Sequence, residues 1–97
     1  MALVSQRFPT YSEVVALVNT MGLPKANILK IDTDAISGGW VIWHYGGSGA
    51  SQTLHARHFM RHSELAAFVN SSPISAANIL KIDADPGNGG YCLFWYT

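Results

Sequence analysis

This 97-residue sequence contains little charge and almost no cysteine. Charged residues make up 12% of the chain, against roughly 25% in a typical soluble domain, and six basic residues balance six acidic ones. This balance argues against a broad basic field that would hold nucleic acid or an anionic membrane. The single cysteine, Cys92, cannot form a disulfide within the chain, so we interpret it as a small buried apolar residue.

Long hydrophobic segments are also missing. No run approaches the ~18 apolar residues that a membrane-spanning helix needs. The first residues, MALVSQRF, have neither the basic start nor the apolar stretch of a secretion signal. We therefore expect a cytoplasmic protein that does not act at a membrane.

The sequence contains no familiar catalytic motif. It has no G-x-S-x-G nucleophile turn, no phosphate-binding P-loop and no H-E-x-x-H zinc motif. None of its glycine pairs, at 38–39, 46–47 and 89–90, precedes a predicted helix as a phosphate-binding loop would. We expect no cofactor and no metal, and we favour a non-enzymatic protein over an enzyme.

What the sequence does contain is an internal repeat. Residues 8–45 and 59–96 align at a constant offset of 51 without a gap, and 17 of the 38 aligned positions are identical. Halves of about 45 residues are close to the lower size limit for independent folding, so the two copies should share one core. The sequence predicts a single domain, 1–97, built from repeats at about 3–45 and 54–96 and joined by a flexible Gly/Ser loop at 46–51.

A helix is predicted near the start of each copy. Thr10 and Glu13 fit a capping box, and the apolar residues that follow have helical spacing up to the stop at Gly22. The second copy has Arg61 in place of the capping threonine, so Ser63 is the expected cap there.

Two hairpins are predicted after the helices. The segment Asn-Ile-Leu-Lys-Ile-Asp occurs at 27–32 and again at 78–83, and returning strands follow at 40–45 and 91–96. The repeated unit is then αββ, or βαββ if a short strand precedes each helix. We predict an α+β fold in which one antiparallel sheet carries both helices on one face, with pseudo-twofold symmetry.

Strand alternation sorts the residues of the returning strands into two faces. We assign one set to the helix-covered core: Val41, Trp43, Tyr45, Cys92, Phe94 and Tyr96. The outer face would then carry Trp40, Ile42, His44, Tyr91, Leu93 and Trp95, with Lys30 and Lys81 nearby if Leu29 and Ile31 point inward. This outer face is more apolar than a solvent-facing sheet normally is.

The predicted outer face is the main candidate site, consisting of Trp40, His44, Tyr91, Trp95, Lys30 and Lys81. Aromatic residues are enriched at the centres of protein interfaces, so we favour a symmetric homo-oligomer, most simply a dimer. The alternative is a nucleotide or single-stranded nucleic-acid binding protein that uses the same aromatics as a stacking platform together with a patch at Arg57 and Arg61. A different protein and a small anionic ligand are further candidate partners of the chain.

A second group of candidates lies in one copy only: His55, Arg57, His58, Arg61 and His62. They could bind an anion near a helix start, and His58 with His62 has a spacing that could hold a metal. Ordinary surface charge is the preferred interpretation. The D-x-D pairs at 32–34 and 83–85 fit turn capping better than cation binding. A small metal-dependent or hydrolytic enzyme is the remaining alternative.

Overall fold

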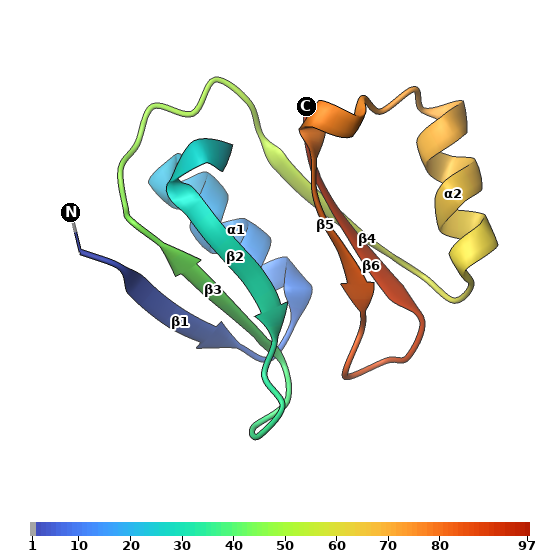
Figure 1. Ribbon diagram of the computed structural model, residues 1–97, viewed down its shortest axis with the longest axis horizontal. Helices are drawn as coiled ribbons and strands as arrows, with labels where there is room; N and C mark the ends of the chain where they lie inside the picture. The colour runs from blue at the N-terminus through green and yellow to red at the C-terminus, as the bar shows by residue number, and fades with distance from the viewer. Residues whose placement is uncertain (1) are drawn as a thin grey trace.

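The computed structural model describes residues 2–97 and shows an α+β fold with two helices and two three-stranded antiparallel sheets (Figure 1). The elements of the first unit are β1 (Val4–Phe8), α1 (Tyr11–Met21), β2 (Ile28–Thr33) and β3 (Trp40–His44). Those of the second are β4 (Leu54–Phe59), α2 (His62–Ser71), β5 (Ile79–Ala84) and β6 (Tyr91–Tyr96). One turn of 3-10 helix, at Lys25–Asn27 and Ala76–Asn78, precedes β2 and β5.

The strands form two sheets where the sequence predicted one. The strand orders are β1-β3-β2 and β4-β6-β5, so the returning strand is central in each sheet. The strand before each helix, which the repeat suggested only weakly, is present in both units. Each unit is therefore βαββ.

The helix starts agree with the sequence prediction in the first unit and differ in the second. Thr10 precedes α1, but its hydroxyl donates to the Glu13 carboxylate at 2.9 Å instead of bonding the backbone. Before α2 the capping position is Arg61, so the prediction of Ser63 was wrong. The carboxylate of Glu64 accepts a hydrogen bond from the Arg61 backbone N–H at 3.1 Å and satisfies that group without a capping hydroxyl.

A β-bulge in the repeated hexapeptide decides which of its side chains face the helix. Ile28 pairs with His44 and Lys30 with Trp43, so one residue of β2, Leu29, is extra. The bulge shifts the alternation by one position. Ile28 and Ile31 are buried in the core while Leu29 is exposed, so only Ile31 meets the condition, set for both Leu29 and Ile31, of pointing inward. The same register shift occurs in β5, between Ile79 and Lys81.

In β3 the predicted faces are reversed. Trp40, Ile42 and His44 are buried in the core beside α1. Tyr45 is exposed, and Trp43 lies on the opposite side of the sheet from α1 and is only partly buried. Alternation correctly separated the two sets, but both sets are apolar enough to form a core. Hydrophobicity alone could therefore not indicate which set the helix covers.

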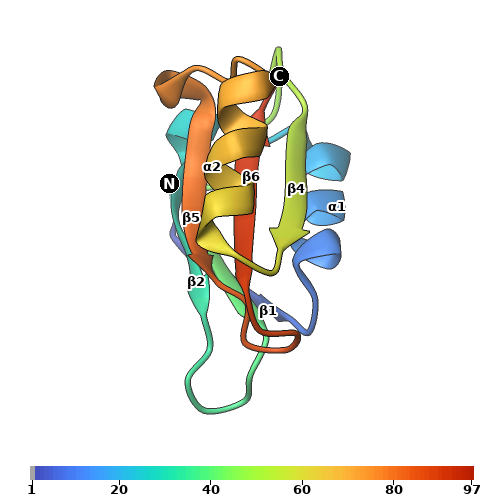
Figure 2. The same cartoon turned by 90° about the vertical axis from the view of Figure 1, so that its right-hand side faces the viewer.

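The second sheet is covered on both faces. On one side Cys92, Phe94 and Tyr96 join the main core, together with α1 and the inner residues of the first sheet. On the other side Leu93 and Trp95 pack with residues of α2. Figures 1 and 2 show the resulting arrangement, in which the second sheet lies between the first unit and α2, with α1 beside β4 and β2 beside β5.

The two units meet through different faces, and this does not support the predicted pseudo-twofold relation. Trp40 packs edge-on against Phe94, with ring centroids 5.3 Å apart. A twofold axis would also pair their counterparts in the repeat, Tyr91 and Trp43. Trp43 instead lines the outer face of the first sheet, while Tyr91 is partly exposed on the α2 side of the second.

Each repeat has a glycine, Gly39 or Gly90, directly before the returning strand, at a position that leaves no room for a side chain. Gly90 has a φ of 66°, and a Cβ there would lie 2.3 Å from the carbonyl oxygen of Phe59. We expect Gly90→Ala to lower the free energy of unfolding by about 1 to 3 kcal/mol or more. Gly87→Ala, where the nearest atom would be 3.6 Å away, is the control in urea denaturation. Equal stability of the two variants would contradict this account.

The buried thiol of Cys92 predicts resistance to modification. Burial, assisted by the negative charge of Asp85, raises its pKa to about 12, so little of the reactive thiolate forms at neutral pH. We expect thiol reagents to label the native protein at least about 1,000-fold more slowly than the unfolded chain, because opening of the core must come first. Measured labelling rates with and without denaturant test this. Rapid stoichiometric labelling of the native protein would show that the two units separate easily.

Candidate functional site: the outer face of the first sheet

The outer face of the first sheet is an apolar surface that the two units leave open. We define it by Leu3, Leu29, Trp43 and Tyr45, with Lys30 at its edge. Trp43 and Tyr45 lie here because their neighbours in β3 face α1, and the bulge in β2 adds both Leu29 and Lys30 to the same side. Leu3 continues the surface beside β1.

This face carries an open depression of about 380 Å³ lined by Leu3, Leu29, Lys30 and Trp43. Leu29 is 61% exposed and Leu3 is 46% exposed. A cluster of large apolar side chains in contact with water marks a binding or interaction surface. Sequence reasoning placed Trp43 and Tyr45 in the core, and no local signal in the hexapeptide indicates the bulge that moves Leu29 outward.

Two of the predicted site residues, Trp40 and His44, lie in the core. The ring of His44 forms a hydrogen bond with the amide oxygen of Gln6 at 3.3 Å, and its Nδ1 accepts the Gly46 N–H at 3.1 Å. These bonds satisfy a buried polar ring. Since neither residue reaches the surface, the placement of Trp40 and His44 on an outer contact face was wrong.

Tyr91 and Trp95, the other predicted aromatics, are on the α2 side of the second sheet. Trp95 is half-buried, stacks on His55 at 5.3 Å between ring centroids and meets Phe68 of α2 edge-on at 5.4 Å. Tyr91 is 37% exposed at the start of β6. The four aromatic and histidine residues of the predicted face are thus separated: Trp40 and His44 lie in the core, and Tyr91 and Trp95 lie on the α2 side of the second sheet.

Lys30 and Lys81 take part in a small charge network where the units meet. Lys30 lies 3.5 Å from Asp32, and Lys81 lies 3.9 Å from Asp32 and 3.5 Å from Asp83. The Thr33 backbone N–H, followed by the charge of Lys81, holds the pKa of Asp32 below its usual value. Lys81 therefore connects the two sheets, while Lys30 stays at the edge of the outer face.

The five residues of the predicted anion patch are divided between structural roles. His55 contacts Thr97 and Trp95, whereas the His58 ring forms a hydrogen bond at 2.6 Å with the carbonyl oxygen of Gly89, in the turn between β5 and β6. The Arg57 guanidinium lies over the Phe59 and Phe68 rings, at 5.1 and 4.7 Å from their centroids.

The last two residues of the predicted patch, Arg61 and His62, lie at the start of α2. Arg61 caps α2 and His62 is its first residue. His58 is in a strand, so the helical spacing proposed for His58 and His62 is not formed. Within residues 2–97, no group of three His, Cys, Asp or Glu side chains is placed to hold a metal ion.

The D-x-D aspartates cap turns, as the preferred interpretation predicted. Asp34 accepts backbone hydrogen bonds from Ile36 and Ser37 at 3.0 and 3.2 Å. Asp85 accepts the corresponding bonds from Gly87 and Asn88 at 2.9 and 3.3 Å. Asp34 is only partly buried and has Arg7 near it, whereas Asp85 is buried and contacts the Cys92 thiol at 3.5 Å.

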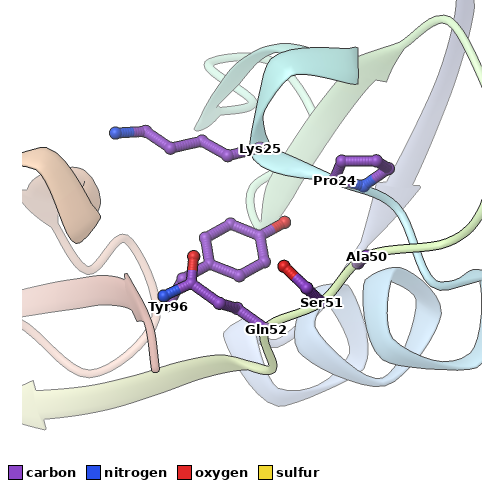
Figure 3. Close-up of a pocket in the computed structure, with 6 residues that line it drawn as sticks. All are labelled: Pro24, Lys25, Ala50, Ser51, Gln52 and Tyr96. Carbon is purple, nitrogen blue, oxygen red and sulfur yellow. The ribbon is translucent and has the colours of Figure 1, made fainter.

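A second depression lies at the junction of the units and is too small for a ligand (Figure 3). Its volume is about 60 Å³, room for only a few water molecules. Figure 3 shows the Tyr96 side chain extending toward the segment of Pro24 and Lys25, beside the linker residues Ala50, Ser51 and Gln52. The Tyr96 hydroxyl donates to the Leu23 carbonyl oxygen at 2.9 Å, so this region ties the units together.

Comparison with family models, with curated proteins and with solved structures gave no match for this chain. Within residues 2–97, neither helix is both long and apolar enough to cross a membrane. Any functional conclusion therefore depends on the surfaces described above.

The buried turn aspartate predicts a specific loss of stability in acid. Burial opposes the charge on Asp85, but the N–H groups of Gly87 and Asn88 outweigh it and hold the pKa below the usual value. The stabilisation that ionised Asp85 adds to the free energy of unfolding is therefore complete above its pKa in the unfolded chain, about 3.9. It is lost as the pH falls through the lower pKa of the folded state.

We expect Asp85→Ala to lower stability at pH 7 by about 1 to 3 kcal/mol and to flatten the fall in stability between about pH 5 and pH 2. Asp34→Ala is the control, because Asp34 makes the same two turn bonds in a more exposed setting. Urea denaturation at a series of pH values measures both effects. An unchanged pH profile in Asp85→Ala would contradict the assigned role.

Proposed function

We propose that this chain is a non-enzymatic protein-interaction module that associates with copies of itself through the outer face of the first sheet. The observation that carries the proposal is the cluster of the exposed Leu3 and Leu29 with the partly buried Trp43 around an open depression. A surface of this kind loses apolar contact with water when another protein covers it, and each large side chain buried contributes about 1.5 to 3 kcal/mol. Lys30 at the edge gives the contact a polar border.

The composition of the chain supports the same proposal. With 12% charged residues and a net charge of zero, this protein has little electrostatic repulsion to keep copies apart. Trp43 and Tyr45 of the outer face belong to the aromatic types that are enriched at the centres of interfaces. The nucleotide-binding alternative has less support, because Arg57 lies over rings on the α2 side of the second sheet, separated from Trp43.

Sedimentation velocity over a range from about 1 to 500 μM, the range of weak to moderate affinities, tests the proposal. We expect the wild-type protein to form particles heavier than its 10.5 kDa monomer. Leu29→Glu should weaken association at least about tenfold, because it places a charge at the centre of the contact.

Ile36→Glu is the matched control, since Ile36 is 96% exposed in the turn after β2 and lies outside the outer face. It should associate like the wild type. Circular dichroism and thermal unfolding show whether each variant is folded. A wild-type protein that stays monomeric throughout the range would overturn the proposed function.

A further inference from the structure

The two units contact each other through the helix side of the first unit and the outer face of the second. Each unit also has an uncovered surface that corresponds in the repeat to the surface that the other unit buries. The first unit buries its helix side and leaves its outer face open. The second unit buries its outer face and leaves part of its helix side open. The protein therefore exposes two different surfaces. In the repeat, these correspond to the two surfaces that contact each other at the internal junction.

Exposure at equivalent positions shows how closely the free surfaces correspond to the buried ones. On the helix side, Ile31 is 2% exposed and its counterpart Ile82 is 48% exposed, while Trp40 is 1% and Tyr91 is 37% exposed. The second sheet is what covers Ile31 and Trp40. We call the uncovered counterpart the free helix side and define it by Asn70, Ile74, Ile82 and Tyr91.

On the outer faces the second unit has the buried residues and the first unit has the exposed ones. Leu54 is 1% exposed and its counterpart Leu3 is 46% exposed, and Tyr96 is 2% exposed where Tyr45 is 39% exposed. Leu54 and Tyr96 are buried by α1 and the first sheet. Within residues 2–97 nothing covers Leu3 and Tyr45 in this way, although both are large apolar residues.

The polar contacts of the internal junction are also repeated on the free surfaces. The Asn19 side chain donates to the Leu54 carbonyl oxygen and accepts the Leu54 N–H, both at 2.9 Å. Its counterpart at position 70 is also an asparagine, and Asn70 is exposed on α2. The Tyr96 hydroxyl bonds the Leu23 carbonyl oxygen, and the counterpart of Tyr96 is again a tyrosine, Tyr45.

The ion pair between the units is not repeated on the free surfaces. Lys81 lies 3.9 Å from Asp32 across the junction. The counterpart of Lys81 is Lys30, on the edge of the outer face, but the counterpart of Asp32 is Asp83, which pairs with the buried Cys92 in the sheet and lies 3.5 Å from Lys81 within the junction. The free surfaces therefore correspond to the buried ones in their apolar residues and in their hydrogen-bonding groups.

We propose that the outer face of one copy binds the free helix side of a second copy and reproduces the internal junction between chains. This inference rests on the proposed function and names the partner surface. Trp43 would pack against the partner's Tyr91 as Phe94 packs against Trp40 within the chain. Tyr45 would donate to the carbonyl oxygen of the partner's Ile74, and the partner's Asn70 would bond the backbone at Leu3.

Such a contact joins two different surfaces, and this changes the expected assembly. A symmetric dimer would use the same surface of both copies, whereas a head-to-tail contact leaves one free outer face and one free helix side at the ends. Further copies then add until the assembly closes as a ring or extends as a filament. The proposed contact therefore predicts a head-to-tail assembly, which differs from the symmetric dimer expected from the sequence.

A mixing experiment with two single-surface variants tests the head-to-tail contact. Leu29→Glu blocks the outer face and leaves the free helix side intact, while Ile82→Glu does the reverse. In sedimentation velocity each variant alone should be monomeric where the wild type assembles. An equimolar mixture should form a 1:1 complex of twice the 10.5 kDa chain mass and nothing larger, because each variant retains one working surface.

The outcomes separate this inference from the proposed function. If Ile82→Glu alone assembles like the wild type while Leu29→Glu does not, the head-to-tail contact is overturned and the outer face remains an interface. If the mixture stays monomeric although both folded variants have lost assembly, the complementary pairing is also overturned. The Ile36→Glu control should assemble normally, and thermal unfolding checks that Ile82→Glu is folded.

A milder variant tests the polar part of the contact. Asn70→Ala removes an exposed side chain from α2, so it should leave monomer stability nearly unchanged. We expect it to raise the dissociation constant of the assembly about threefold to tenfold, the effect of losing one or two hydrogen bonds. No change in the dissociation constant would show that Asn70 does not take the role that Asn19 has inside the chain.

Discussion

The contact between the second sheet and the first unit is the interaction on which the rest of this structure depends. Each unit has only one helix and three strands, too little to bury a core of its own. By inserting Phe94 and Tyr96 toward Trp40 and Ile42, the second sheet completes the core of the first unit. Each large side chain buried in this way contributes about 1.5 to 3 kcal/mol.

Hydrogen bonds fix the geometry of that contact. The amide group of Asn19 matches the exposed edge of β4 by bonding both the N–H and the carbonyl of Leu54. Tyr96 brings the end of β6 to the segment after α1 through its bond to Leu23. Apolar contacts alone are non-directional, so these bonds set how the sheet lies against the helix.

A consequence of this arrangement is that similar sequences end in dissimilar environments. The first unit is covered on its helix side by another sheet, and the second is not. The second unit is covered on its outer side, and the first is not. Residues such as Ile82 and Leu3, which would be buried at the equivalent position of the other unit, therefore meet water. The proposed assembly would remove that difference by letting copies cover one another.

The sequence by itself determined the elements of this protein. The capping and stop residues around α1, the repeated hexapeptide and the turn aspartates each carry a local signal, and each marks the element that forms there. The fold class and the separation of strand residues into two sets follow from the same local patterns. Interactions between residues near in the chain are sufficient for these features, because helix and strand periodicity depend on the backbone alone.

Only the tertiary structure decided which surfaces are buried. Both sides of β3 and β6 are apolar, so alternation could not indicate that Trp40 faces α1 and Trp43 faces outward. The bulge at Leu29 depends on pairing with β3, and the division into two sheets depends on how the second unit packs against α1. These features arise from contacts between distant parts of the chain, and the same side chain is core or surface according to which unit covers it.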